Sequence, residues 1–202
     1  RPEFLAALRQ LCDENDMLLI LDEVQTGIGL TGRMWGFQTV GVEPDLFAFG
    51  KKMQVCGFAS NDRIFDEPEN VFTVSSRINS TWGGNLVDMV RARRYLEIIE
   101  EEDLVENARV VGGFLQERLR ELAADFPGKM GNVRGKGLFI AFDLPDGATR
   151  GKVLSTWLQK HNVMGLASGE NAIRLRPALT LTKDEALLGV QRLRATLTEV
   201  LG

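Results

Sequence analysis

Hydrophobic positions at helical spacing alternate along the first half of the chain with short, wholly apolar runs. In residues 2–16, Leu8 and Cys12 belong to one apolar face, which predicts a helix. The apolar run 17–21 follows this helix directly, and a second run covers 45–49. Short apolar runs in such positions are typical of buried parallel strands. The pattern therefore predicts an α/β arrangement in this half.

The pattern changes near residue 100, where long amphipathic helices are predicted over 85–101 and 104–124. Beyond them the sequence predicts strands near 138–142, 163–167 and 172–176 and helices over 149–161 and 182–201. The motif Thr182-Lys-Asp-Glu is a capping box that begins the last helix. We expect residues 1–100 to be part of a large, mostly parallel-sheet α/β domain and 101–202 to be a small C-terminal α+β domain.

Charge and composition exclude several classes of function. The chain has 202 residues with 24 Lys+Arg and 28 Asp+Glu, a net charge of −4. Mild acidity provides no basic surface for nucleic acid or an anionic membrane, and no apolar run approaches the roughly 20 residues of a bilayer span. Two cysteines without CxxC spacing favour a reducing, cytoplasmic location, and one histidine makes a metal site a poor interpretation.

Residues 27–32 fit the dinucleotide-binding pattern G-x-G-x-x-G, but their context does not fit it. That fingerprint requires a glycine at the end of a strand, a helix that begins on the last glycine and an acid about 20 residues later. Here residues 23–26 separate the strand from the first glycine, and 33–37 form a poor helix start. We expect a mobile or tightly turned loop whose glycines permit positive φ.

An acid and a lysine follow the two apolar runs, Asp22 after the first and Lys51 soon after the second. Ligands of open parallel sheets bind at the carboxyl ends of the strands, so these side chains would face one crevice. Pyridoxal phosphate chemistry needs this pair, because a lysine holds the aldehyde as a Schiff base and a carboxylate partners the pyridine nitrogen. The alternative is that Asp22 and Glu23 cap a strand and that Lys51 and Lys52 are solvated loop residues.

Four segments in this order and spacing resemble the class III (ornithine/GABA type) aminotransferases of pyridoxal-phosphate-dependent fold type I. They are Leu21–Gly27, Thr31–Arg33, Pro44–Asp45 and Phe49–Lys52. The resemblance covers essentially the whole chain. It implies the α/β fold of that family, with the chain as its C-terminal part.

The resemblance implies roles for the residues that hold the cofactor, pyridoxal 5'-phosphate. Lys51, directly after Gly50, would form the Schiff base and shuttle the proton, in preference to Lys52. Asp22 would partner the pyridine nitrogen, and Gln25 would donate to the phenolic oxygen. The alternative for Gln25 is that it only caps a turn.

Further implied roles concern phosphate and substrate. Thr81 would bind the cofactor phosphate across a homodimer, unless it is only the N-terminal residue of the following helix, and Asn79 would help hold the distal carboxylate of the substrate. The stretch 173–177 resembles the family's carboxylate-binding strand, with Arg174 as the clamp. We expect Arg174 and Arg176 to face opposite sides of that strand, which makes Arg176 the clamp if the register is shifted.

Segments 49–57, 76–85 and 88–94 most resemble family members that transfer the ε-amino group of L-lysine to 2-oxoglutarate. The implied products are 2-aminoadipate 6-semialdehyde and glutamate, made by a homodimer with a shared active site. The alternatives are an aminotransferase for ornithine, acetylornithine or 4-aminobutyrate, or a catalytically incomplete fragment that acts only as a structural or interaction module. We expect the chain alone to be inactive and to expose apolar surface.

Overall fold

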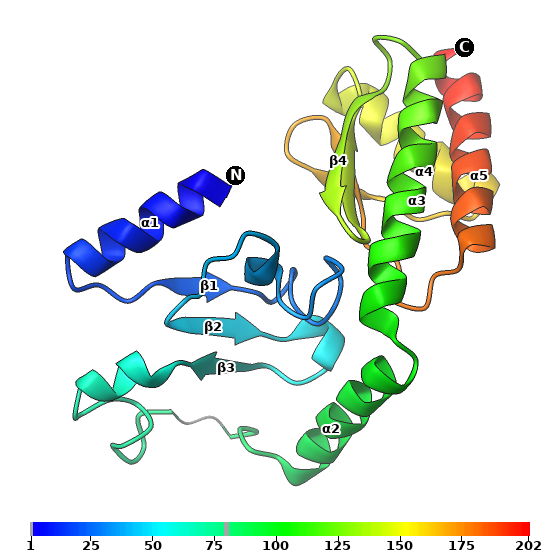
Figure 1. The fold of residues 1–202 in the computed structure, drawn as a ribbon. Coiled ribbons are helices and arrows are strands. Elements are labelled where there is room, and N and C mark those ends of the chain that lie inside the picture. Colours follow the sequence, from blue (N-terminus) through cyan, green and yellow to red (C-terminus); the bar gives the residue numbers. More distant parts are fainter. Residues whose placement is uncertain (1, 79–80) are drawn as a thin grey trace. The chain divides into compact units, whose positions relative to one another are not determined.

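The computed structural model describes residues 2–78 and 81–202. They form two compact units. Figure 1 shows both and labels their α-helices and the strands β1 to β4. The first unit contains the chain up to Gly29 and Arg33–Glu102, and the second contains Leu30–Gly32 and Asp103–Gly202. A single boundary in the sequence therefore does not describe the division, because Leu30–Gly32 packs with the second unit.

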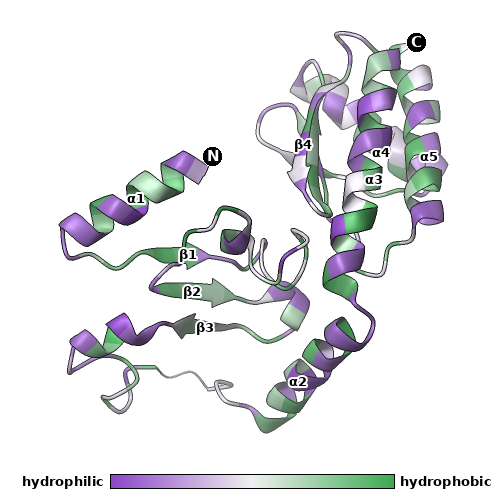
Figure 2. Ribbon diagram, in the orientation of Figure 1, coloured by the Kyte–Doolittle hydropathy of each residue, from purple (hydrophilic) through white to green (hydrophobic). Residues whose placement is uncertain are grey.

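The first unit is a small three-stranded sheet with helices. Its elements are α1 (Pro2–Glu14), β1 (Ile20–Asp22), a 3-10 helix (Gly36–Thr39), β2 (Leu46–Phe49), a 3-10 helix (Lys51–Met53), β3 (Gly57–Ser60), a 3-10 helix (Asp62–Asp66) and α2 (Leu86–Glu101). The strand order is β1-β2-β3, with β1 and β2 parallel and β2 and β3 antiparallel. Figure 2 shows β2 as wholly hydrophobic, which agrees with its sequence LFAF.

The parallel pair is confirmed, but the first strand is shorter and less buried than predicted. It begins at Ile20 rather than Met17, because the backbone N–H of Leu19 donates to the Asp45 carboxylate at 2.7 Å instead of to a neighbouring strand. Within this stretch Leu19 is buried, whereas Ile20 is 63% exposed. The sequence did not predict β3, since its glycine, alanine and serine carry little strand signal.

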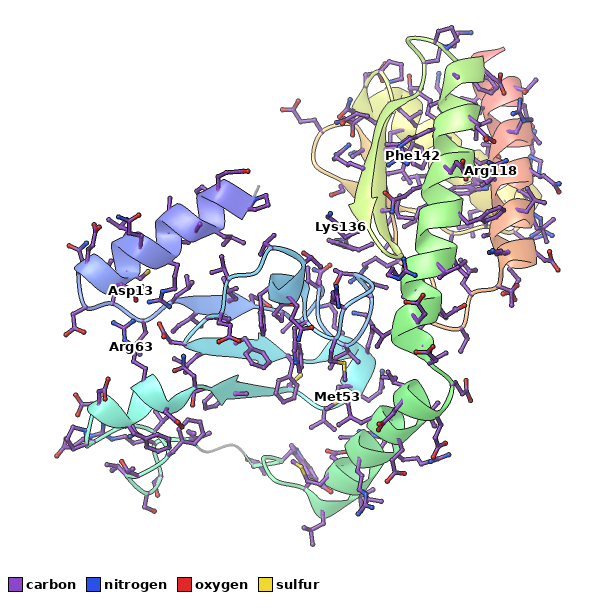
Figure 3. All side chains as sticks on the ribbon, viewed as in Figure 1. Asp13, Met53, Arg63, Arg118, Lys136 and Phe142 are labelled. Carbon is purple, nitrogen blue, oxygen red and sulfur yellow. The ribbon has the colours of Figure 1, made fainter. Side chains whose placement is uncertain are left out.

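Helix α1 packs on this sheet through a small apolar cluster of Cys12, Leu19 and Val42. Polar contacts supplement it: Arg63, on the 3-10 helix after β3, points toward Asp13 near the end of α1 (Figure 3), with the nitrogen and oxygen 2.9 Å apart. The same arginine lies 3.5 Å from the Asp45 carboxylate. Ion pairs therefore link the end of α1 and the start of β2 to the 3-10 helix after β3.

The second unit is an antiparallel sheet with three helices. Its elements are α3 (Leu104–Asp125), β4 (Gly131–Lys136), β5 (Phe139–Asp143), α4 (Gly147–His161), β6 (Leu166–Ser168), β7 (Ala172–Leu175) and α5 (Lys183–Leu201). The strand order is β4-β5-β7-β6, with every neighbouring pair antiparallel. The three helices lie on one face of this sheet (Figure 1). Strand β4 was not predicted, because its residues GNVRGK are mostly glycine and polar.

One apolar core fills the space between this sheet and its helices. Strand β5 alternates half-buried and buried positions, and its buried residues Ile140 and Phe142 point into the core. Leu193 of α5 and Leu119 of α3 complete it from the helix side. The predicted capping box at Thr182 and Glu185 is confirmed and begins α5. The periodic apolar face of each helix is thus the face that is buried.

The glycine-rich loop 27–32 is tightly turned, as predicted. Gly29 and Gly32 have φ of +83° and +79°, conformations that glycine adopts without steric cost. The Leu30 carbonyl accepts a hydrogen bond from the Leu138 backbone at 2.9 Å, which ties this loop to the second unit. None of the helices in the described part of the chain combines the length and apolarity needed to cross a membrane.

Candidate active site

The ends of β1 and β2 bring two predicted site residues to the same edge of the sheet. Asp22 is the last residue of β1 and lies opposite Ala48 of β2, and Glu23 N donates to the Ala48 carbonyl at 2.9 Å. Lys51 follows two residues after the end of β2. Because the strands are parallel, both residues lie at the carboxyl ends of the strands. Both side chains are exposed there.

The backbone at Lys51 is in a conformation that is unusual for a residue with a side chain. Its φ is +46°, in the left-handed region, and it begins the 3-10 helix Lys51–Met53. Such a conformation costs about 1 kcal/mol or more and persists only where surrounding contacts impose it. Strained residues cluster at functional sites, which is consistent with a role for this lysine.

The neighbouring lysine has a different role in the structure. Lys52 Nζ donates a hydrogen bond to the Gln25 carbonyl oxygen at 3.0 Å. This bond joins the turn after β2 to the turn after β1. Lys52 is half-buried, whereas Lys51 is exposed. The structure therefore distinguishes the two lysines: Lys52 connects the two turns, and Lys51 presents its amine.

The turn that carries Asp22 and Gln25 is ordered by short-range hydrogen bonds. Asp22 Oδ1 accepts from the Val24 backbone at 3.0 Å, and the Glu23 carbonyl accepts from Gly27 N at 2.8 Å. Gln25 lies in this turn, half-buried. Asp22 and Gln25 therefore belong to one turn, which adjoins the turn of Lys51 and Lys52.

Sequence reasoning did not single out Glu23, which is the buried acid of this turn. It is 4% exposed, and its carboxylate accepts from the Thr26 hydroxyl and from the backbone of Gly36 and Phe37. The available signal was local: a hydroxyl residue three positions after an acid is typical of side-chain hydrogen bonding within a turn. The partners at 36–37 carry no such signal, because they contribute only backbone N–H groups.

A second buried acid, Asp45, directly precedes β2 and orders the first unit. It accepts from Arg9 Nη1 and Leu19 N, each at 2.7 Å, and from Asn61 Nδ2 at 3.3 Å. Burial raises the pKa of the Asp45 carboxyl, but the hydrogen bonds from Leu19, Arg9 and Asn61 outweigh it and hold that pKa below its usual value. Asp45 thus fixes the start of β1 against the start of β2.

Thr81 is exposed in a turn before α2. Helix α2 begins at Leu86 and is capped by Asn85, whose side chain accepts from Val87 N at 2.9 Å. The alternative that Thr81 is the helix's N-terminal residue is therefore wrong. Asn79, the predicted substrate contact, lies outside the described residues.

The two candidate arginines belong to the second unit. Arg174 is in β7, between Ala141 of β5 and Leu166 of β6, and Arg176 lies just beyond the strand end. Both line the same mostly apolar cavity of about 390 Å³. The expectation that they face opposite sides is wrong, because positions two apart in a strand share a face. Either guanidinium can therefore serve this cavity.

The described residues contain no group of three or more His, Cys, Asp or Glu side chains arranged to hold a metal ion. The arrangement at the sheet edge is instead that of an acid, an amide and an amine on two adjacent turns. Comparison with known proteins identifies the family of the chain. The model of the class-III aminotransferases matches residues 1–197. The chain belongs to the class-III aminotransferase family.

Curated relatives include several enzymes of one specificity. The chain is 50% identical over 198 residues to the L-lysine-epsilon aminotransferase of Streptomyces clavuligerus, covering 98% of this chain and 43% of that protein. It is 52% identical over 200 residues to that of Mycobacterium tuberculosis, covering 99% and 44%. The acetylornithine aminotransferase of Neisseria meningitidis is 35% identical over 199 residues, covering 98% and 49%.

The fold agrees with a solved structure of the same family. The lysine aminotransferase from M. tuberculosis superposes with a TM-score of 0.95 at 52% identity, covering 99% of this chain and 46% of that chain. The predicted fold class is therefore confirmed. The chain spans less than half the length of the lysine aminotransferases that it matches.

Proposed function

We propose that this chain is the lysine-bearing part of an aminotransferase that moves the ε-amino group of L-lysine to 2-oxoglutarate. The products are 2-aminoadipate 6-semialdehyde and glutamate. The observation that carries the proposal is the parallel pairing of β1 with β2, because Asp22 and Lys51 then lie at the carboxyl ends of two adjacent strands. Identity of 50–52% to lysine aminotransferases, against 35–36% to acetylornithine and 4-aminobutyrate enzymes, favours lysine.

The residues at this edge fit pyridoxal 5'-phosphate, the cofactor on which class III aminotransferases depend. When bound, that cofactor supplies an electron sink for the substrate carbon that loses a proton. Asp22, a carboxylate at the strand end, would hold a proton on the pyridine nitrogen. Gln25 would donate to the phenolic oxygen, and Thr81 would hold phosphate. Lys51 would carry the proton to and from the reacting carbon.

Two groups would hold substrate carboxylates. A guanidinium binds a carboxylate with two parallel hydrogen bonds, and Arg174 has the position in β7 that the family resemblance assigns to this role. Asn79 would assist at the distal carboxylate of lysine. A carboxylate held in this way would fix the orientation of the bound substrate.

We further propose that the protein is a cytoplasmic homodimer in which Thr81 serves the partner's cofactor. The free cysteines Cys12 and Cys56 support a reducing compartment. The exposed turn of Thr81 is suited to contact outside its own unit. In domain terms, we assign residues 1–100, apart from Leu30–Gly32, to the large cofactor-binding domain, and residues 101–202 to the small one.

Reductive labelling tests the proposal directly. The protein as its gene encodes it is incubated with pyridoxal phosphate, reduced with borohydride and digested, and the labelled peptide is sequenced by mass spectrometry. We expect a stable adduct on Lys51 and none on Lys52, because the amine of Lys52 is engaged with the Gln25 carbonyl. A protein that remains unlabelled would instead be a structural or interaction module without this chemistry.

A substrate panel tests the choice of amino donor. Lysine, ornithine, acetylornithine and 4-aminobutyrate are compared with 2-oxoglutarate as the acceptor, and glutamate formation is followed. We expect the highest kcat/KM with lysine. If ornithine has a higher kcat/KM than lysine, the assigned specificity is wrong while the reaction class stands.

A further inference from the structure

The turn that carries Asp22 and Gln25 is built around a carboxylate that faces inward. Glu23 lies between these two residues in sequence and is 4% exposed, whereas Asp22 is exposed. An ionised carboxylate is costly to bury unless hydrogen-bond donors surround it. The contacts of Glu23 therefore show what its burial achieves.

Three donors converge on the Glu23 carboxylate. Oε2 accepts from Thr26 Oγ1 at 2.5 Å and from Gly36 N at 2.8 Å, and Oε1 accepts from Phe37 N at 2.8 Å. Hydrogen bonds to a charged acceptor are roughly twice as strong as neutral ones. Glu23 thus closes its own turn through Thr26 and anchors that turn to the segment at 36–37.

Two glycines allow this close approach. A Cβ on Gly36 would lie 2.9 Å from Glu23 Oε2 and 2.8 Å from Thr26 Cβ. A Cβ on Gly27 would lie 2.7 Å from the Trp35 ring. Contacts below 3.0 Å force a shift of one partner. The backbone at both positions is therefore shaped around the buried carboxylate and the ring beside it.

The anchored segment is itself held against the strand that leads to Lys51. Trp35 packs on Phe47 and Phe49 of β2, with ring centroids 4.5 and 5.9 Å apart. Phe37 packs on Phe47 at 5.5 Å. The carboxylate of Glu23 therefore connects the turn after β1 to a rigid aromatic cluster on β2.

We propose that Glu23 is a positioning residue: its inward carboxylate holds the turn so that Asp22 and Gln25 present their side chains to the cofactor. The inference rests on the proposed function and deepens it. Glu23 touches neither substrate nor cofactor in this assignment. It acts through its neighbours, because Asp22 and Gln25 belong to the turn that the Glu23 carboxylate holds.

The test compares Glu23→Gln with Glu43→Gln in the protein as its gene encodes it. Glu43 is an exposed acid in the same unit and serves as the matched control. Glutamine keeps the size of Glu23, but it removes the charge and directs an amide N–H₂ at one of three donors. Cofactor affinity is measured by equilibrium dialysis, and absorbance of the bound cofactor is recorded as a function of pH.

For Glu23→Gln we expect about tenfold weaker cofactor binding and a shifted pH titration of the cofactor absorbance, because Asp22 no longer holds the ring proton firmly. The borohydride adduct on Lys51 persists, since Lys51 lies on the other turn. Glu43→Gln matches the wild type in both readouts. A purely structural role would lower the thermal midpoint and leave the titration of the folded protein unchanged, and that result would overturn the inference.

A milder variant keeps the test decisive if Glu23→Gln fails to fold. Thr26→Val removes only the hydroxyl donor, at nearly constant volume, and is expected to shift the titration in the same direction by a smaller amount. An unchanged titration in folded Thr26→Val then overturns the inference. If the wild type itself forms no adduct on Lys51, the proposed function fails, which is a separate outcome.

Discussion

The two units of the chain are stabilised in different ways. The second is organised around one continuous apolar core, in which Phe142 and Leu193 are fully buried. The first has a small apolar cluster at α1 and two buried acids, Glu23 and Asp45, that order its turns and strand starts. The acid and lysine of the candidate site belong to this first unit. The candidate site thus belongs to the unit whose turns and strand starts are ordered mainly by hydrogen bonds to buried acids.

The units also differ in the exposure of apolar side chains: both expose some, and more of them belong to the first unit. In the first unit Ile20 of β1 is 63% exposed, and Leu86 and Val90 of α2 are 80% and 70% exposed. The expectation that this chain exposes apolar surface is therefore confirmed. Leu86 and Val90 line one mostly apolar surface of α2, and contiguous apolar surface marks interaction sites. The comparison teaches that an apolar core stabilises the second unit, while the first unit relies on a polar framework.

The largest expected effect is on activity and falls in the first unit. Lys51→Ala should lower transamination by at least about three orders of magnitude, because the group to which we assign the proton transfer is lost. Lys52→Ala is the matched control. It removes only the bond to the Gln25 carbonyl and should cost about 10–100-fold through misplacement of the turn. Glutamate formation from lysine and 2-oxoglutarate measures both, and equal losses would contradict the distinction between the two lysines.

The next largest effect is on the stability of the second unit. Phe142→Ala removes a fully buried ring from the centre of the core, which should lower the free energy of unfolding by about 3–5 kcal/mol. Phe142→Leu retains most of the volume and should cost less than about 1.5 kcal/mol. Urea unfolding followed by circular dichroism measures the difference. Similar costs for both substitutions would show that packing is not what stabilises this unit.

A polar substitution tests the first unit in the same way. Asp45→Ala leaves the Leu19 N–H and the Arg9 guanidinium without their acceptor, which should cost about 2–3 kcal/mol. Hydrogen exchange should then increase in β1 and β2 and leave β5 and β7 protected. An increase spread equally over both units would show that the units do not differ in the way described.

The smallest effect is a pH dependence from the same acid. The pKa of Asp45 is lowered in the folded chain, so the folded state binds fewer protons than the unfolded state as the pH falls. Its contribution is complete above the unfolded value of about 3.9 and is lost as the pH drops through the folded pKa. Unfolding midpoints measured between pH 2 and 6 should fall more gently in Asp45→Asn than in the wild type. If the midpoints of the two proteins fall in parallel with pH, Asp45 is not the source of the pH dependence.

The sequence by itself determined the elements with strong periodicity and the order of the motifs. Helices α3 and α5 were predictable because their apolar positions recur at helical spacing and α5 begins with a capping box. The parallel pairing of β1 and β2 was also predictable, since wholly apolar runs next to helices are typical of parallel strands.

Tertiary structure alone decided which polar groups face inward. Strands β3 and β4 form through pairing with neighbours, although their own residues carry little strand signal. Glu23 and Lys52 look like solvated neighbours of the site in the sequence, and their burial and bonding come from backbone groups distant along the chain. Backbone N–H and C=O groups are the same for every residue type, so no sequence pattern marks where a buried carboxylate or amine will find its partners.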